Sequence, residues 1–257
     1  MLSPIPVLTI SGHDPTGGAG IQADIEAILS HGCHPLSLIT CLTAQDTQDV
    51  RRIFPQPVDA LLEQLEVLFD DIPVQAVKIG LLGTDEVAQA IAYALRKHRP
   101  RIVVLDPVLH SGGGQSLADN ALIETLKREL LPLTTVLTPN LLEARRLTGE
   151  HKAAACAKAL LTSGCQAVLI TGGDEPTPVI YNTLYHAAGI KTFTWERLPH
   201  GAHGSGCTLA SALAALLAQG LTLEEAARKA QQYTWNAIKH SFRPGRGQFI
   251  PKRMFWS

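Results

Sequence analysis

Ile102-Val103-Val104-Leu105-Asp106-Pro107 joins four consecutive apolar residues to an acidic residue and a proline. An apolar run of this length is typical of a strand in a parallel sheet that is covered on both faces. Similar runs recur along the chain, and longer segments with a helical spacing of apolar residues lie between them. The alternation predicts a single α/β domain over residues 1–257, in which helices flank a central, mostly parallel sheet.

The individual elements follow from the same patterns. We expect strands at residues 7–11, 36–40, 76–80, 102–106, 135–138, 167–171, 179–184 and 192–197. We expect helices at residues 20–30, 58–69, 85–98, 120–131, 141–147, 153–163, 207–219 and 223–240. Thr222 and Glu225 predict a capping box at the start of the last helix, and residues 241–257 are expected to form an extended tail.

Composition excludes several classes of protein. Of the 257 residues, 46% are hydrophobic and 18% are charged, which is not the composition of a disordered chain. The formal net charge of −1 gives no overall field that would attract nucleic acid or an anionic membrane, so neither is expected as a partner. No apolar run reaches the roughly 18–20 residues of a membrane helix, and the first residues do not resemble a signal peptide. The five cysteines contain no CxxC pair, which predicts reduced thiols in a cytoplasmic protein.

Ligands of open α/β sheets bind at the carboxyl ends of the strands, so the segments that follow the strands are the first candidates. The glycine-rich segment 11–20 follows the first strand, and Gly18 and Gly20 loosely match a dinucleotide fingerprint. The acidic residue that this fingerprint needs about 20 residues later is absent, and so is the P-loop sequence GxxxxGK[ST]. The segment is either a ligand loop or a tight turn, and Asp14 and Asp24 either fix a polar ligand or cap the next helix.

A second glycine-rich segment opens an apolar helix near the C-terminus: Gly204-Ser205-Gly206-Cys207. Free backbone amides and the positive end of the helix dipole make such a turn an anion site. The same dipole is expected to lower the pKa of the Cys207 thiol. The alternative is a small buried thiol that packs a helix turn.

Asn140 and Glu143 follow another predicted strand and are three residues apart, so on a helix they share one face. Their oxygen atoms suit Mg²⁺ or its water ligands beside phosphate groups. The alternative is a capping box, in which Asn140 caps the helix and Glu143 closes the cap.

Together these segments resemble the hydroxymethylpyrimidine/phosphomethylpyrimidine kinase family of thiamine biosynthesis, within the ribokinase-like superfamily. The resemblance is collinear from about residue 5 to residue 220. It is carried by residues 12–24 (GHDPTGGAGIQAD), 43–47 (TAQDT), 71–73 (DIP), 77–82 (VKIGLL), 104–108 (VLDPV), 138–144 (TPNLLEA) and 203–208 (HGSGCT).

The resemblance implies a three-layer ribokinase-like fold, a homodimer, and a kinase that depends on ATP and Mg²⁺. Such a kinase acts twice. It phosphorylates the hydroxymethyl group of 4-amino-5-hydroxymethyl-2-methylpyrimidine, and it then converts the monophosphate into the diphosphate.

The family pattern also assigns residues to the site. Gln45 would hydrogen-bond the pyrimidine ring, in a pocket lined by Gly12, Asp14, Ala19, Asp24, Gln45, Leu81 and Val108. Mg²⁺ would be organised, directly or through water, by Asn140 and Glu143, and the nucleotide side would include Thr171 and Gly173. The anion hole would be formed by Gly204, Ser205, Gly206 and Cys207. Cys207 stands where sugar kinases of the superfamily carry the catalytic Asp, and we hypothesise that its thiolate accepts the proton of the acceptor hydroxyl late in the transfer.

The chain departs from the family pattern in several places. Family members often have Lys-Gly-Gly-His where this chain has Thr171-Gly172-Gly173-Asp174, so a positive charge on the phosphate side is lost. Ser205 replaces the usual threonine and Leu81 the usual methionine, which are mild changes. His200 and His203 either approach phosphate or are ordinary loop histidines. The loop with Gly112-Gly113-Gly114 is either a flexible flap or a turn.

Two other functions compete with the pyrimidine kinase. Pyridoxal kinase, of the same superfamily, also acts on a hydroxymethyl group of a heteroaromatic ring, and the combination of Gln45, Leu81 and Cys207 argues against it. A non-catalytic pyrimidine-binding module would explain the threonine at position 171, whereas the intact Asn140, Glu143 and 204–207 segments argue for catalysis.

Overall fold

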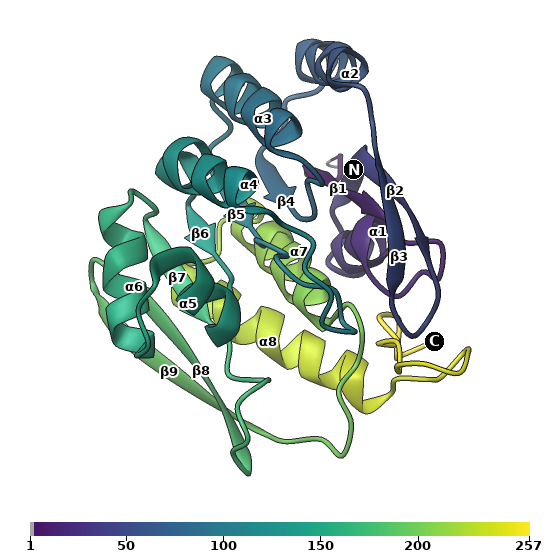
Figure 1. Ribbon diagram of the computed structural model, residues 1–257, viewed down its shortest axis with the longest axis vertical. Helices are drawn as coiled ribbons and strands as arrows, with labels where there is room; N and C mark the ends of the chain where they lie inside the picture. Colours follow the sequence, from purple (N-terminus) through teal and green to yellow (C-terminus); the bar gives the residue numbers. More distant parts are fainter. Residues whose placement is uncertain (1–2) are drawn as a thin grey trace.

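The computed structural model describes residues 3–257, and these residues form one nine-stranded sheet flanked by helices (Figure 1). In chain order the strands are β1 (Pro6–His13), β2 (His34–Gln45), β3 (Val50–Pro55), β4 (Ala76–Ile79), β5 (Ile102–Leu105), β6 (Val136–Leu137), β7 (Ala167–Ile170), β8 (Val179–His186) and β9 (Gly189–Glu196). The helices are α1 (Gly20–Ser30), α2 (Val58–Asp71), α3 (Asp85–His98), α4 (Asn120–Thr125), α5 (Leu141–Thr148), α6 (Ala153–Thr162), α7 (Ser205–Ala218) and α8 (Leu223–Lys239).

The order of the strands across the sheet is β3-β2-β1-β4-β5-β6-β7-β8-β9. The pairings from β2 through β7 are parallel, and β3, β8 and β9 add antiparallel pairs at the two edges. The chain runs from β1 outward to β2 and later returns to the other side of β1 with β4. This reversal between β1 and β4 is the point at which an open sheet leaves a crevice at the carboxyl ends of its strands.

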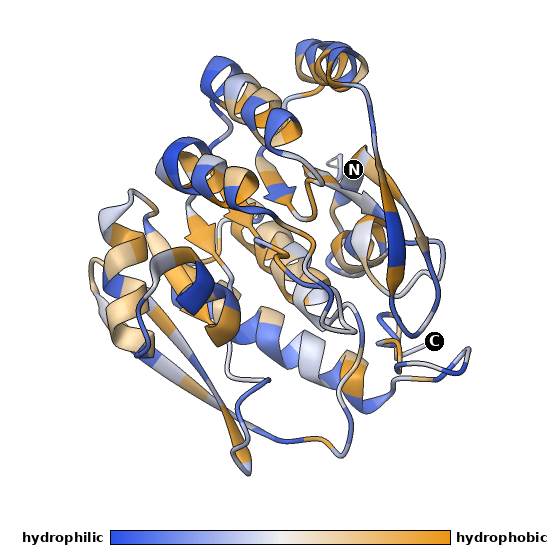
Figure 2. Cartoon of the chain, viewed as in Figure 1, coloured by the Kyte–Doolittle hydropathy of each residue, from blue (hydrophilic) through white to orange (hydrophobic). Residues whose placement is uncertain are grey.

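Helices cover both faces of the sheet, as the sequence predicts. Strand side chains alternate between two cores: in β7, Val168 and Ile170 face the core under α2 to α6, whereas Ala167 and Leu169 face the core under α1, α7 and α8. Figure 2 shows that the central strands and α7 are largely apolar, consistent with their burial in the middle of the molecule. The expected three-layer α/β architecture is confirmed.

One strand was not predicted. Strand β2 continues to Gln45 and forms a hairpin with β3, which contains Arg51 and Arg52 and is mostly exposed. Because an exposed strand with two arginines lacks an apolar alternation, the sequence pattern gave no indication of it. The hairpin matters because it brings Gln45 to the carboxyl end of the sheet.

The helix predicted over residues 120–131 is also irregular. It is α-helical to Thr125, continues as a π-helix over Leu126–Leu130 and ends as a 3₁₀ turn over Leu131–Leu133 that contains Pro132. A proline cannot donate the backbone hydrogen bond that would continue a regular helix. By contrast, the capping box predicted at Thr222 and Glu225 is present at the start of α8.

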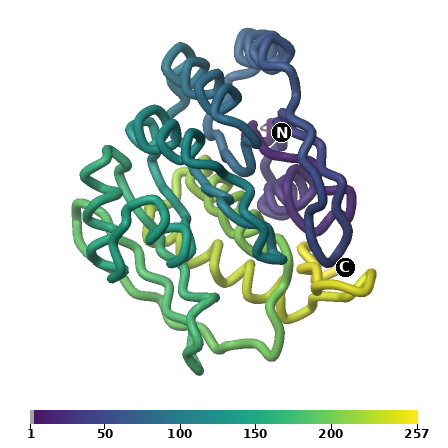
Figure 3. Tube along the Cα trace, in the orientation of Figure 1, coloured from purple at the N-terminus to yellow at the C-terminus, as the bar shows by residue number. Residues whose placement is uncertain are grey.

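The C-terminal tail packs against the body of the protein. Figure 3 shows it, in yellow, against the N-terminal part of the chain, in purple. Phe242 pairs with Ile250, and Arg253 is almost completely buried. No helix within residues 3–257 is both long and apolar enough to cross a membrane. All five cysteines are buried and form no disulfide.

Candidate active site

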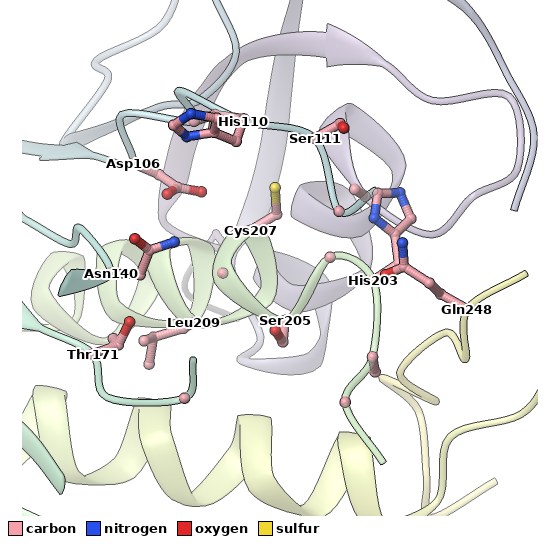
Figure 4. A pocket seen from close by; sticks show the side chains of 18 of the residues that line it. Asp106, His110, Ser111, Asn140, Thr171, His203, Ser205, Cys207, Leu209 and Gln248 are labelled. Atoms are coloured by element: carbon pink, nitrogen blue, oxygen red, sulfur yellow. The ribbon is translucent and has the colours of Figure 1, made fainter. Parts of the chain in front are cut away.

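A cavity of about 1100 Å³ lies at the carboxyl ends of the strands, beside the reversal between β1 and β4. Both glycine-rich segments of the sequence line it, as do the hairpin, the loop after β5, the loop after β7 and part of the tail. Figure 4 shows Asp106, Asn140 and Cys207 directed into this space from three different elements. The structure therefore brings together segments that are far apart in the sequence.

The first glycine-rich segment is a rigid loop organised by Asp14. Its carboxylate accepts hydrogen bonds from the backbone N–H groups of Thr16 and Ala19, both at 2.8 Å, and from His203 Nε2 at 3.0 Å. Burial alone would raise the pKa of Asp14, but the hydrogen bonds from His203 and Thr16 hold it well below its usual value. His203 is thus not an ordinary loop histidine, because it ties the second glycine-rich segment to the first.

Glycine is required where this loop turns into α1. Gly20 has a φ of +59°, and a Cβ atom there would lie 2.3 Å from the carbonyl oxygen of Gly12. The sequence match to a dinucleotide fingerprint at this position therefore reflects a tight backbone approach. The residues that the resemblance assigns to the pyrimidine pocket line the cavity with one exception: Gly12, Asp14, Ala19, Gln45, Leu81 and Val108.

The exception is Asp24, which is fully buried beneath the site and does not line the cavity. Both of its carboxylate oxygens lie 2.8 Å from Lys78 Nζ, and they also accept hydrogen bonds from Thr9 at 2.6 Å and Ser211 at 2.7 Å. Burial alone would lower the pKa of Lys78, but attraction to Asp24 raises it above its usual value. The Asp24 carboxylate therefore joins α1 to the sheet and to α7.

The second glycine-rich segment forms the first turn of α7, which begins at Ser205, two residues before the predicted start. Gly204 precedes it with a φ of +83°, and a Cβ atom there would lie 1.9 Å from the carbonyl oxygen of Gly18. The first N–H groups of a helix have no acceptor within the helix. The Ser205 N–H donates to the Ala202 carbonyl oxygen at 3.4 Å. Gly206 and Cys207 also line the cavity, and their N–H groups are the donors that the turn offers to an anion.

The expected effect of the helix dipole on Cys207 is wrong. Burial raises the pKa of this thiol to about 12 despite the attraction of Lys78, and repulsion from Asp106 and Asp24 adds to the rise. Burial and two nearby carboxylates raise the free energy of the thiolate by more than the helix dipole lowers it. Cys207 is therefore a neutral thiol in the resting protein.

Asp106 and Glu143 are buried carboxyl groups with raised pKa values. Burial raises the pKa of Asp106 to about 6, although Lys78 and a hydrogen bond with Cys207 oppose the rise. Burial and repulsion from Asp106 raise the pKa of Glu143 to about 7. This pair of carboxylates thus concentrates negative charge at the cavity wall, which favours a bound cation.

The capping box between Asn140 and Glu143 is present at the start of α5. Asn140 Oδ1 accepts from the Glu143 N–H at 2.8 Å, and Glu143 accepts from the N–H groups of Asn140 at 3.1 Å and Leu109 at 3.0 Å. Within residues 3–257, no group of three or more His, Cys, Asp or Glu side chains is placed to hold a metal ion. These donors fit an ion that keeps most of its water and phosphate ligands, which is the habit of Mg²⁺.

The far end of the cavity is formed by the loop after β7, with Thr171, Gly173 and Asp174 in its lining. Arg197 fastens this loop by donating to the carbonyl oxygens of Thr177 at 2.5 Å, Glu175 at 2.6 Å and Gly173 at 2.7 Å. It is the only lysine or arginine among the described residues that line the cavity. His200 also lines the cavity and stacks obliquely on Phe249, with ring centroids 4.0 Å apart.

The loop after β5 closes one side of the cavity. Val108 lies in it with a φ of +41°, a strained conformation for a β-branched residue. Ser111 Oγ donates to Asp49 Oδ1 at 2.6 Å, and a Cβ atom on Gly113 would lie 2.4 Å from the same side chain. The loop is therefore joined to the β2–β3 hairpin across the cavity mouth.

Sequence reasoning gave no role to three residues that organise the site: Lys78, Arg197 and Arg253. Lys78 could have been noticed, because a lysine inside the apolar run Ala76-Val77-Lys78-Ile79 must find a buried partner. Arg197 binds backbone carbonyl groups of another loop, and Arg253 binds the carbonyl groups of Gly17 and Gly18 together with the side chains of Thr208 and Glu26. No residue pattern in the sequence reveals such partners.

The sequence and structure were compared with those of known proteins. The family described as phosphomethylpyrimidine kinase matches residues 14–252. The hydroxymethylpyrimidine/phosphomethylpyrimidine kinase of Salmonella typhimurium is 39% identical, with 82% of each chain covered. The thiamine biosynthesis bifunctional protein ThiED of Geobacter sulfurreducens is 41% identical over 94% of this chain, and this chain spans 50% of that protein's length.

Solved structures resemble the whole fold. The pyridoxal kinase of Bacillus subtilis, determined as an ADP complex, has a TM-score of 0.92 and 31% identity, and 99% of each chain is covered. The phosphomethylpyrimidine kinase of Clostridium difficile has a TM-score of 0.82 and 34% identity, over 91% of this chain and 99% of that chain. The fold, the shared motifs and the family match over most of the sequence agree, and the chain belongs to the phosphomethylpyrimidine kinase family.

Proposed function

We propose that the protein is a kinase that transfers the γ-phosphoryl group of ATP to 4-amino-5-hydroxymethyl-2-methylpyrimidine, and then phosphorylates the product to the diphosphate, in thiamine biosynthesis. One observation carries the proposal. The rigid loop that lines the pocket for an acceptor touches the first turn of α7, which offers backbone donors to an anion. An acceptor hydroxyl and a transferred phosphoryl group would therefore meet at this junction.

The acceptor pocket suits a small heteroaromatic ring. Leu81 and Val108 supply apolar walls, and Gln45 supplies an amide for the polar edge of the ring. Gly12 and Ala19 leave room for the ring close to the backbone. Asp14 acts mainly by shaping the loop, because its oxygens already accept several hydrogen bonds, and Asp24 acts through Lys78 rather than by contact.

We place ATP along the cavity from the start of α7 toward the loop after β7. The backbone donors of residues 204–207 would hold the transferred phosphoryl group, while Thr171 and Gly173 would lie beside the nucleotide. Arg197 would supply the permanent positive charge that the threonine at position 171 does not. The crystal complexes of related kinases with ADP support the use of this nucleotide class.

Mg²⁺ would be held by Asn140 and Glu143 through water, because their oxygens already accept backbone hydrogen bonds. When bound, the ion neutralises charge on the phosphate oxygens. The raised pKa of Glu143, at about 7, supports a cation at this position, since a cation would relieve the repulsion from Asp106.

The proton of the acceptor hydroxyl leaves late, because the transition state of phosphoryl transfer has little bond formation to the acceptor. A neutral Cys207 cannot accept that proton unless it gives up its own. We therefore assign the final proton to Asp106, which lies beside Cys207 and has a pKa of about 6. Cys207 Sγ would take the hydroxyl proton as its own proton moves to the Asp106 carboxylate, and the acceptor oxygen would bond to phosphorus as ADP departs.

Pyridoxal is the second candidate acceptor. The observation in its favour is the similarity of the whole fold to the pyridoxal kinase of Bacillus subtilis, with a TM-score of 0.92. The pyrimidine remains the preferred acceptor, because the matching family and the relative from Salmonella typhimurium both carry that name.

The deciding experiment measures ADP release with Mg-ATP in the presence of hydroxymethylpyrimidine, its monophosphate or pyridoxal, each in a separate reaction. Turnover of both pyrimidines is the expected result. Turnover of pyridoxal alone would assign the second function. Binding of the pyrimidine without turnover of any acceptor would indicate a non-catalytic module.

We further propose that the enzyme works in the cytoplasm as a homodimer. Five buried cysteines without a disulfide are compatible with a reducing compartment. The dimer follows from the family resemblance. Light scattering coupled to size-exclusion chromatography tests it, and a monomer at micromolar concentration would contradict it.

A further inference from the structure

Arg253, in the C-terminal tail, is a buried arginine outside the catalytic motifs, with an exposure of 2%. Its guanidinium donates to the carbonyl oxygens of Gly17, at 3.2 Å, and Gly18, and to Thr208 Oγ1 at 2.9 Å. It also forms an ion pair with Glu26 at 3.1 Å. A planar guanidinium has donors in fixed directions, so it sets the relative positions of the groups that it binds.

Arg253 binds groups of both loops that meet at the proposed site of transfer. These are the glycine-rich segment 11–20, called the acceptor loop here, and the turn that opens α7. Gly18 lies in the acceptor loop, and Thr208 lies in the first turn of α7, where its hydroxyl donates to the carbonyl oxygen of Gly204 at 2.8 Å. Gly18 and Gly204 are themselves in contact, since a Cβ on Gly204 would lie 1.9 Å from the Gly18 carbonyl oxygen. Arg253 therefore holds the two loops together at the point where they touch.

A second link holds the same two loops on the cavity side. Asp14 accepts from the Ala19 N–H at 2.8 Å and from His203 Nε2 at 3.0 Å, and His203 directly precedes the turn into α7. The His203 link faces the cavity, whereas the Arg253 link lies behind the loops. Together they leave the loops little freedom to separate or slide.

We propose that Arg253 is a positioning residue that fixes the separation between the acceptor loop and the anion-binding turn of α7. The inference rests on the proposed kinase function. Burying a guanidinium is costly, and stability alone could be served by an apolar side chain of similar size. The reacting atoms of a phosphoryl transfer must be aligned closely, and a displacement of about 1 Å lowers the rate about 100-fold.

The test compares Arg253→Met, Arg253→Lys and the control Glu26→Gln. Arg253→Met keeps an unbranched apolar stem and removes every donor. Arg253→Lys keeps the charge but cannot reach both loops in fixed directions. Glu26→Gln alters only the outer ion pair, at a side chain that is 39% exposed, and leaves the loop contacts in place.

For each variant, kcat and KM are measured at a temperature where circular dichroism shows it to be fully folded. We expect kcat to fall about 30- to 100-fold for Arg253→Met and about tenfold for Arg253→Lys, with KM for each substrate within about threefold of the wild type. Glu26→Gln should stay within about threefold in both constants. If Arg253→Met does not fold, Arg253→Lys decides the question. A kcat for the folded Arg253→Lys protein equal to that of the wild type would overturn the proposal.

Amide hydrogen exchange gives a readout that does not depend on the acceptor. Arg253→Lys should increase exchange in both residues 17–20 and residues 204–208, whereas Glu26→Gln should not. Unchanged exchange in both segments would refute the positioning role whatever the enzyme phosphorylates. A different combination of results separates the two proposals. If Arg253→Lys increases exchange in both segments, but the wild-type protein turns over only pyridoxal or no acceptor, the pyrimidine kinase function is refuted and the positioning role of Arg253 is established.

Discussion

Two groups of buried carboxylates lie close together in this protein and have opposite electrostatic situations. Asp24, beneath the site, has both oxygens within 2.8 Å of the Lys78 ammonium group. Asp106 and Glu143, at the cavity wall, form no ion pair with any of residues 3–257, and burial raises the pKa values of both, although Lys78 opposes the rise at Asp106. The charge of Asp24 is neutralised within the protein, by Lys78. The charges of Asp106 and Glu143 are neutralised only when a proton or a cation binds.

We interpret the Asp24 charge as structural and the charges of Asp106 and Glu143 as functional. A buried ion pair that is satisfied by hydrogen bonds fixes the packing of the elements that carry it. Buried carboxylates without a paired cation cost stability, and groups of this kind are concentrated at sites where a ligand or a proton transfer uses them. Four predictions test this distinction, beginning with the largest expected effect.

Lys78→Met should be the most damaging substitution, because it leaves the Asp24 carboxylate buried without its cation. We expect the free energy of unfolding to fall by about 3–5 kcal/mol, measured by urea denaturation. Lys97→Met is the matched control, since Lys97 pairs with Glu66 at the surface and its loss should change stability little. Equal effects of the two substitutions would show that the buried pair contributes no more to stability than the surface pair.

Asp106→Asn should have the opposite effect on stability and a large effect on catalysis. Removal of an unpaired buried charge should raise the free energy of unfolding at pH 8 by roughly 1–2 kcal/mol. The loss of the proton acceptor should lower kcat by about 10²–10⁴-fold, measured with hydroxymethylpyrimidine and Mg-ATP. Cys207→Ser keeps a relay group and should lose less activity; an Asp106→Asn enzyme as active as Cys207→Ser would contradict the assignment.

Glu143→Gln can keep the capping bond to the Asn140 N–H, because glutamine also closes such caps, but it removes the charge and the oxygen that accepts from the Leu109 N–H. We expect the Mg²⁺ concentration for half-maximal activity to rise about tenfold, which is the cost typical of losing one supporting group at a metal site. The thermal stability should fall by no more than the loss of the one hydrogen bond from the Leu109 N–H, and that measurement is the control for an intact cap. An unchanged Mg²⁺ requirement would place the ion elsewhere.

The smallest effect concerns pH. Because the folded-state pKa values of Asp106 and Glu143 are raised to about 6 and about 7, their contribution to stability is present in acid and is lost as the pH rises through these values. The metal-free protein should therefore lose stability between about pH 4, where these groups ionise in the unfolded chain, and about pH 7, where they have ionised in the folded protein, and Mg²⁺ should restore it at pH 8. The double variant with Asp106→Asn and Glu143→Gln should show neither the decline nor the Mg²⁺ response, and a decline of equal size in that variant would assign it to other groups.

Sequence patterns were informative where a feature depends on neighbouring residues. The apolar run at 102–105, the glycines before α1 and α7 and the capping box at Thr222 are all local, and each is found where it was expected. Strand β3 was missed because its exposed arginines hide the strand pattern, and the helix from residue 120 was predicted as regular although Pro132 ends it in a 3₁₀ turn.

The site shows the same division. The sequence alone determined which segments line the cavity, because strand ends, glycine turns and the Asn140 to Glu143 spacing are local features that match the family motifs. Only the tertiary structure decided what those groups contact and how their pKa values shift. Lys78 and Asp24 are 54 residues apart, and Arg253 and Gly18 are 235 residues apart. The pKa of Cys207 depends on burial and on Lys78, Asp106 and Asp24, which come from other parts of the chain, and it rises although the position at a helix start predicts a fall. Burial and charge compensation are sums over neighbours in space, and a sequence does not contain these sums until the chain has folded.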